Sequence, residues 1–211
     1  MLKNYSIDSN EVVHQIDKNE FIYDEQYIKD RYVKYGDTCR TMGILRLSYL
    51  LGSIVLKPKK ILDVGYGNGA FLDICSDYGL ITYGYDISNF KINSKHIILK
   101  YDEVFNYEYD VVCMFDSMEH MENPEKFLEG LRTKYVFVSV PNYKPELGDE
   151  WFFYWKHRRE NEHLHHYSER SLTKFFKSYN YDLIDLSNVE DIIRQDQQNI
   201  PNITTAIFRR M

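Results

Sequence analysis

Residues 60–69, with the sequence KILDVGYGNG, decide the fold of this chain. Apolar residues at 61, 62 and 64 surround Asp63, and glycines follow as Gly65, Gly67 and Gly69. A buried strand that runs into a glycine turn and then into a helix presents backbone N–H groups where a ligand can approach closely. We therefore expect a strand–turn–helix unit with a ligand bound at the turn.

Two classes of cofactor are compatible with this unit. Asp63 stands at the carboxyl end of the expected strand, where a carboxylate can accept hydrogen bonds from a cationic or hydroxylated ligand. Gly65, Gly67 and Ala70 also satisfy the dinucleotide fingerprint G-x-G-x-x-A, and Asp86 follows where a ribose-binding acid is expected. Asp63 favours a ligand without a pyrophosphate, because neighbouring anions repel each other. The glycines alone leave both classes open.

Composition restricts the class of protein. The 211 residues carry 26 Lys and Arg against 32 Asp and Glu, a formal net charge of −6. This length allows one domain with a full central sheet, and the acidic balance makes a nucleic-acid partner unlikely. Cys39, Cys75 and Cys113 lack a metal-binding spacing, which indicates a reduced, cytoplasmic protein. The N-terminus lacks the apolar core of a signal peptide, and no apolar segment approaches the ~20 residues of a membrane span.

Hydrophobic periodicity predicts the order of the elements. Residues 1–20 read as a loose arm, followed by helices over 23–35 and about 40–55 with a break at 36–38. Seven strands are expected, at 60–64, 81–87, 96–100, 109–115, 135–140, 181–189 and 203–210. Three further helices are expected between them, at 70–78, 123–131 and 168–179. Only residues 88–95 separate the second strand from the third, so the helix of that crossover should be shortened or lost.

This order predicts an α/β fold. We expect a Rossmann-like, seven-stranded, mostly parallel sheet with an antiparallel C-terminal edge strand and helices on both faces. Residues 1–56 would form an N-terminal helical arm and cap, and residues 57–211 the core. Residues 141–167 would form an aromatic lid insertion, because long segments of this kind are usually functional covers.

The pattern Asp-x-Gly-x-Gly-x-Gly at 63–69 resembles the first motif of the class I S-adenosylmethionine (SAM) methyltransferases. Three further segments resemble the small-molecule branch that includes the ubiquinone-biosynthesis O-methyltransferases: CRTMGILRLSYLLG (39–52), DVVCMFDSMEHMENP (110–124) and EHLHHYSERSLTKFF (162–176). The resemblance covers residues 23–209 and implies methyl transfer from SAM to a small-molecule acceptor, most often at oxygen. Two alternatives stay open: a nucleic-acid or modified-nucleotide methyltransferase, and a non-catalytic SAM-binding partner subunit. A homodimer is a further candidate assembly.

The resemblance also implies a set of cofactor contacts. Arg40 would pair with the SAM carboxylate, and Asp63 would lie near the amino group. The backbone of Gly65, Gly67 and Gly69 would pass under the methionine. Asp86 would accept from the ribose hydroxyls, Ile87 would lie against the adenine, and Tyr101 follows the third strand where the adenine edge is read. Packing is the alternative role for Tyr101.

Candidate catalytic and metal-binding groups come from two segments. Asp116, Glu119 and His120 would share one face of a helix and could bind a divalent cation, which lowers the pKa of an acceptor hydroxyl. The alternative is an ordinary helix start with favourable acidic residues. Glu119 is also a candidate catalytic residue.

The second segment holds Glu162, His163, His165 and His166. In an extended chain His163 and His165 would point one way and His166 the other, so the three cannot all converge. His166 is a candidate general base, because imidazole titrates near neutral pH, and a structural role is equally compatible.

An aromatic stretch precedes these histidines. Residues 151–155, WFFYW, would form a wall for a flat or apolar acceptor, or would pack against the N-terminal tyrosines. Lys156, Arg158 and Arg159 beside it could attract a phosphate, a carboxylate or a nucleotide, or could be solvated.

Overall fold

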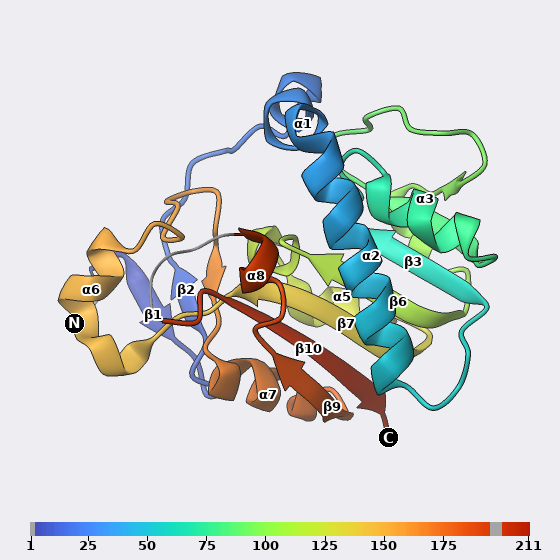
Figure 1. The fold of residues 1–211 in the computed structure, drawn as a ribbon. Coiled ribbons are helices and arrows are strands. Elements are labelled where there is room, and N and C mark those ends of the chain that lie inside the picture. The colour runs from blue at the N-terminus through green and yellow to red at the C-terminus, as the bar shows by residue number, and fades with distance from the viewer. Residues whose placement is uncertain (1–2, 195–199) are drawn as a thin grey trace.

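A computed structural model describes residues 3–194 and 200–211. Within these ranges a seven-stranded sheet with the order β5-β4-β3-β6-β7-β10-β9 forms the centre of the molecule (Figure 1). Its strands are β3 (Lys60–Val64), β4 (Ile81–Tyr85), β5 (Ile97–Ile98), β6 (Tyr109–Phe115), β7 (Thr133–Pro141), β9 (Tyr181–Ser187) and β10 (Ile203–Arg210).

The strand directions confirm the expected fold class. β3 pairs in parallel with β4 and β6, β4 with β5, and β6 with β7. β10 runs antiparallel to both β7 and β9, so the antiparallel pairing lies at the C-terminal side of the sheet. β9 is the outermost strand there, and β10 lies between it and β7.

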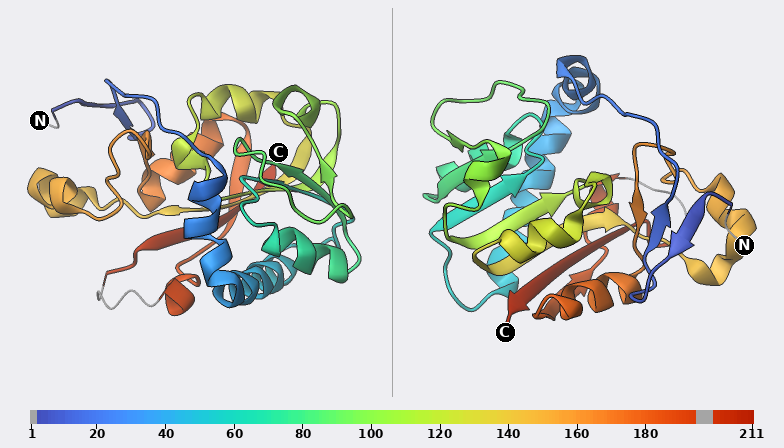
Figure 2. Two further views of the ribbon diagram at one scale, coloured as in Figure 1. Left: turned by 90° about the horizontal axis from the view of Figure 1, so that it is seen from above. Right: turned by 180° about the vertical axis from the view of Figure 1, so that it is seen from behind.

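Helices cover both faces of the sheet. α2 (Gly36–Ser53) and α3 (Ala70–Asp77) lie on the face toward the viewer in Figure 1, while α5 (Pro124–Gly130) and α7 (Glu169–Ser178) lie on the face seen from behind in Figure 2. Alternating strand residues supply the two cores: Ile61 packs with the α2 and α3 side chains, and Leu62 with those of α5 and α7. Burial on both faces explains why these strands are apolar at almost every position.

Two predicted boundaries were wrong. A 3-10 turn at Val33–Tyr35 separates α1 (Glu25–Arg31) from α2, and α2 begins at Gly36, inside the expected break. β5 contains only Ile97 and Ile98, although a strand was expected over 96–100. The predicted loss of a helix between β4 and β5 is confirmed, since residues 88–95 contain only turns and coil.

The N-terminal segment is ordered, so the predicted loose arm was wrong. β1 (Tyr5–Ile7) and β2 (Val13–Gln15) form an antiparallel hairpin, and β2 pairs with β8 (His165–His166). This small sheet and α6 (Gly148–Tyr154) lie side by side, beyond one end of the large sheet (Figures 1 and 2). Strands of three residues are too short to show an alternating pattern, which is why the sequence did not indicate them.

The other short helices are α4 (Tyr101–Val104), α8 (Asp191–Arg194) and 3-10 turns at Met118–His120 and Pro145–Leu147. Among the helices of the described ranges, none is both long enough and apolar enough to cross a membrane.

Replacing Val12 with alanine tests whether the hairpin is part of the core. Val12 is fully buried in the main core cluster, so Val12→Ala should lower the free energy of unfolding by about 1–3 kcal/mol in urea titration. The matched control Ile16→Ala changes an exposed side chain and should have little effect. Equal, negligible effects of both substitutions would contradict the docked hairpin.

Candidate functional site

The glycine turn after β3 lies directly against the segment that follows β6. Gly65, Gly67 and Gly69 adopt φ values of +81°, +55° and +78°, which favour glycine. A Cβ atom added at Gly65 would lie 2.8 Å from the Cβ atom of Ser117. A side chain would therefore close the space between the two loops, and glycine keeps the backbone open to a ligand.

Asp86 connects the glycine turn to the end of β4. Its Oδ2 accepts a hydrogen bond from the Gly67 N–H at 2.9 Å, and its Oδ1 accepts from the N–H and the hydroxyl of Ser88 at 2.8 and 2.6 Å. The carboxylate is buried and lines a large pocket. Since a carboxylate has about four acceptor positions, Asp86 can hold the loop and still accept from a ligand.

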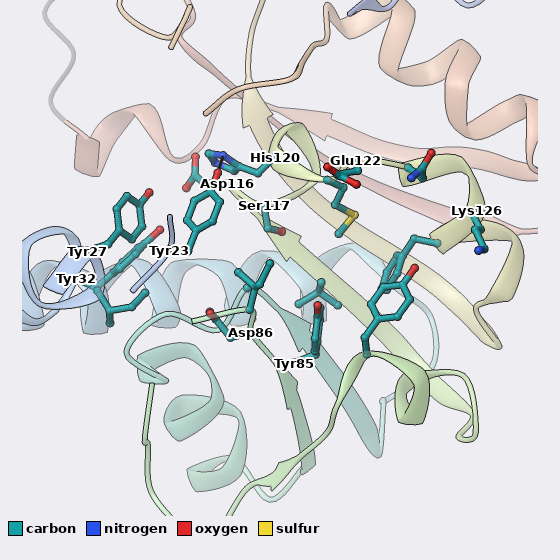
Figure 3. A pocket seen from close by; sticks show the side chains of 18 residues that line it. Tyr23, Tyr27, Tyr32, Tyr85, Asp86, Asp116, Ser117, His120, Glu122 and Lys126 are labelled. Atoms are coloured by element: carbon teal, nitrogen blue, oxygen red, sulfur yellow. Dashed lines mark hydrogen bonds between the residues drawn. The ribbon is translucent and has the colours of Figure 1, made fainter. Parts of the chain in front are cut away.

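The large pocket has a volume of about 430 Å³ and contains four of the expected cofactor residues: Gly65, Asp86, Ile87 and Tyr101. Figure 3 shows Tyr23, Tyr27 and Tyr32 at one end of this pocket, near Asp116 and His120, with Asp86 and Tyr85 on the wall below. The tyrosines come from α1 and its flanking residues, so the N-terminal part of the chain closes one side of the pocket.

A second pocket, of about 250 Å³, lies on the other side of Gly65 and contains Asp63, Arg46 and Arg194. Asp63 is 3% exposed, and its Oδ1 has no hydrogen-bond partner among the described residues. Burial raises the pKa of Asp63 to about 7. A buried carboxyl group with a raised pKa and an oxygen without a hydrogen-bond partner is typical of a ligand-binding or catalytic site.

A third pocket, of about 170 Å³, is lined only by charged, histidine and tyrosine side chains, among them Arg31, Arg159 and Arg194. Tyr32 and Asp116 line all three pockets, so the pockets meet at these two side chains. The arrangement fits an elongated ligand in the first two pockets and a second molecule in the third.

Glu190 organises the charges around this junction. Its fully buried carboxylate accepts a bidentate pair from Arg46 at 2.8 and 2.9 Å, a hydrogen bond from the Ser139 hydroxyl at 2.5 Å and one from Arg194 at 2.6 Å. Burial alone would raise the pKa of Glu190, but the two guanidinium groups hold it well below the usual range. The guanidinium group of Arg194 also donates a hydrogen bond to Asp116 Oδ2 at 2.5 Å.

Glu119, His120 and His163 form a cluster in the third pocket, with one ligand atom of each within 4.8 Å of the others. Both carboxyl oxygens of Glu119 are buried without a partner among the described residues, and burial raises the pKa of Glu119 well above its usual value. Nδ1 of His120 lies 2.7 Å from the carbonyl oxygen of Glu162. If Nδ1–H donates to this carbonyl, Nε2 of His120 is left unprotonated and able to bind a ligand.

His163 completes this cluster. Its ring lies perpendicular to that of His120, with centroids 4.6 Å apart, and its Nδ1 has no partner in the described part of the chain. Burial lowers the pKa of both His120 and His163, which keeps the imidazoles neutral. Two neutral imidazoles and a carboxyl group are ligands that a divalent transition metal accepts.

Three predicted residues are not where the sequence suggested. Arg40 is exposed on α2 and lines none of the three pockets, whereas Arg46 on the same helix lines the second pocket. Asp116 has a φ of +47° and turns toward Arg194, because residues 118–120 form a 3-10 turn instead of the expected α-helix. His166 packs among Tyr5, Phe152 and Trp155, and burial lowers its pKa to about 3.

The aromatic stretch 151–155 contributes no side chain to the pockets described. Phe152 and Trp155 pack with Tyr143 and with Tyr5 and Val13 of the hairpin in a separate core cluster. The pockets described give no support to the expected wall for an apolar acceptor, and the alternative, packing against the N-terminal segment, is what Phe152 and Trp155 show. The same insertion does supply polar groups to the third pocket: His157, Arg159 and His163.

Sequence reasoning did not single out Glu190, Arg194, Tyr32 or the role of His163. The spacing of four between Glu190 and Arg194, typical of a helical ion pair, was the available signal for two of them. Residues 160–162 form a turn, His163 lies in coil and only residues 165–166 form the strand, so the expected common direction of His163 and His165 is not found. His165 instead contacts Nδ1 of His14 at 2.7 Å and the Met121 carbonyl oxygen at 2.7 Å.

The sequence model described as "Methyltransferase domain" matches residues 42–186, so the chain belongs to this methyltransferase family. The protein is an enzyme of the SAM-dependent methyltransferase class, as the glycine motif predicted. It is 23% identical over 170 residues to a ubiquinone biosynthesis O-methyltransferase from Coxiella burnetii, a match that covers 69% of this chain and 73% of that protein.

Solved structures share the fold. The magnesium protoporphyrin IX methyltransferase from Synechocystis, with bound S-adenosylhomocysteine, superimposes with a TM-score of 0.57 at 11% identity, over 92% of this chain and 90% of that one. The 1,6-didemethyltoxoflavin-N1-methyltransferase from Burkholderia thailandensis, with its substrate and S-adenosylhomocysteine, gives a TM-score of 0.56 at 12% identity, over 98% of both chains.

Asp63→Asn tests the buried, unpaired carboxyl. Because burial raises the pKa of Asp63 from 3.8 to about 7, its ionisation reduces the stability of the fold progressively between these pH values. The variant should therefore gain stability relative to the wild type as the pH rises from 4 to 8, by up to about 4 kcal/mol, and the gain should level off above pH 7. Urea titration at each pH measures it. Asp30→Asn, at an exposed position, should show no such trend, and a flat profile for Asp63→Asn would contradict the assigned burial.

Proposed function

We propose that the protein transfers a methyl group from SAM to a hydroxyl oxygen of a small molecule bound in the third pocket. The observation behind this proposal is that Tyr32 and Asp116 line all three pockets. The methyl group must lie where the cofactor and the acceptor are in contact, and such a junction provides that place. The likeness to an O-methyltransferase of ubiquinone biosynthesis supports oxygen as the acceptor atom.

The residues of the first two pockets suit the parts of SAM. In this proposal Asp86 accepts from the ribose hydroxyls, and Ile87 and Tyr101 lie beside the adenine in the large pocket. The backbone of the glycine turn passes under the methionine part. Asp63, whose Oδ1 is unpaired, accepts from the amino group, and Arg46 replaces Arg40 as the partner of the carboxylate.

The chain's own residues must orient the acceptor, exclude water and remove a proton. SAM, when bound, supplies a methyl group already activated by its sulfonium. Tyr23, Tyr27 and Tyr32 cover the junction of the pockets and restrict the access of water. The proton of the acceptor hydroxyl leaves toward the cluster of Glu119, His120 and His163.

This cluster is also the proposed site for a divalent cation. His163 takes the place expected for Asp116, and the orphaned oxygens of Glu119 support the assignment, since buried polar groups are normally hydrogen-bonded. A bound cation would lower the pKa of the acceptor hydroxyl. Without a cation, Glu119 would be the base, in agreement with its predicted catalytic role.

Other sequence-based expectations remain proposals. Cys39, Cys75 and Cys113 are free, which supports the proposed reducing, cytoplasmic location. A homodimer stays a prediction. The net charge of −6 and the small third pocket favour a small-molecule acceptor over nucleic acid.

Calorimetric titration with S-adenosylhomocysteine tests the cofactor site. Asp86→Asn keeps the size of the side chain but replaces a carboxylate oxygen by a hydrogen-bond donor, so the affinity should fall at least about tenfold, or about 1.4 kcal/mol. The exposed control Asp102→Asn should bind as the wild type does. Binding of NADH but not of S-adenosylhomocysteine would reject the proposal. Turnover is then measured as S-adenosylhomocysteine release from SAM with a panel of hydroxylated acceptors.

The cation site is tested separately by titrating metal-free protein with Mn²⁺ and Zn²⁺. His163→Ala and Glu119→Gln should each weaken binding by about 10–100-fold. His157→Ala is the control, because His157 lines the same pocket but does not belong to the cluster. Unchanged metal affinity in the first two variants would assign Glu119 to the general-base role and reject the cation.

A further inference from the structure

The third pocket differs from an ordinary small-molecule pocket in the chemistry of its wall. Pockets for small molecules are lined mainly by apolar and aromatic side chains. This one is formed by arginine, histidine, acidic and tyrosine side chains, with no aliphatic residue, phenylalanine or tryptophan among those described. An apolar acceptor would leave these polar groups desolvated and unpaired, which costs free energy.

Three guanidinium groups line this wall. Arg31 comes from the end of α1, Arg159 from the turn after α6 and Arg194 from the end of α8, so three separate elements bring a guanidinium group to one small cavity. Arg194 pairs with Asp116 and with Glu190, and Arg159 pairs with Glu162 at 3.1 Å. Among the ion pairs of the described residues, none includes Arg31.

The acidic partners do not use all the donors of these three arginines. A guanidinium group has five N–H donors, and the pairs with Asp116, Glu190 and Glu162 leave several of them available. Guanidinium groups bind carboxylates and phosphates in bidentate geometry, which suits this arrangement.

We propose that the acceptor is a small hydroxylated oxyanion, a carboxylate or a phosphate, whose charge is bound by Arg31, Arg159 and Arg194. Its hydroxyl group lies toward Glu119, His120 and His163. The inference rests on the proposed methyl transfer and adds the chemical class of the acceptor. A cavity of about 170 Å³ admits a compact molecule, and a larger acceptor would have only its charged end inside.

Calorimetry on protein saturated with S-adenosylhomocysteine tests the class of acceptor without turnover. The carboxylate probe is salicylate, with salicylamide as its neutral counterpart, and the phosphate probe is phenyl phosphate, with phenol. At least one anion should bind about tenfold more tightly than its neutral counterpart, and the favoured anion identifies the acid group. Arg31→Gln and Arg159→Gln should each reduce this preference several-fold, whereas Arg170→Gln, at an exposed position on α7, should not.

The outcomes separate this inference from the proposed function. Failure to bind S-adenosylhomocysteine rejects the cofactor site itself. Normal S-adenosylhomocysteine binding with equal affinity for the charged and neutral probes, or with no affinity for any of them, overturns the anionic acceptor alone. A preference that survives in both arginine variants also overturns it. Thermal denaturation of Arg31→Gln should give the wild-type midpoint, so that its lost preference reports on binding, whereas Arg159→Gln also removes the partner of the buried Glu162 and is compared at a temperature where both variants are folded.

Discussion

The buried carboxylate of Glu190 is the interaction on which the site depends. It joins Arg46 of α2, Ser139 of β7 and Arg194 of α8 in one hydrogen-bonded set, and Arg194 carries the connection to Asp116 after β6. Removing one partner of a buried ion pair costs about 3–5 kcal/mol, since the remaining charge stays buried without compensation. The set therefore holds the helix, the two strand ends and the C-terminal segment in fixed relation, with two guanidinium groups facing the pockets.

Two other acids at the site show the opposite situation. Asp63 and Glu119 are nearly as buried as Glu190, but no described residue forms a hydrogen bond with Asp63 Oδ1 or with either oxygen of Glu119. Burial raises the pKa of both, so the folded protein carries them at a cost in stability. Natural sequences accept such conflicts mainly at functional sites. The contrast between one satisfied carboxylate and two unsatisfied ones separates the framework of the site from its ligand-binding groups.

Much of the framework was predictable because it depends on local patterns. The strand at Lys60–Val64, the glycine turn and Asp86 follow from apolar runs, glycine spacing and position at strand ends. The helix expected over 168–179 is α7, and the hydroxyl of Ser168 caps it by accepting from the Ser171 N–H at 3.1 Å. The third pocket, the proposed acceptor site, was less predictable. Its residues come from α1, the loop after β6, the insertion at 141–167 and α8, which are far apart in sequence.

The sequence by itself determined the class of fold, the methyltransferase family and the place of the glycine turn, because each depends on residues close together in the chain. Only the tertiary structure decided which of Arg40 and Arg46 faces the second pocket, which histidine joins Glu119 and His120, and that Phe152 and Trp155 belong to a core. Arg40 and Arg46 lie on the same helix, and His163 and His166 are three residues apart. Their roles differ because a helix or a turn presents neighbouring residues to different partners, and those partners are set by packing between distant segments.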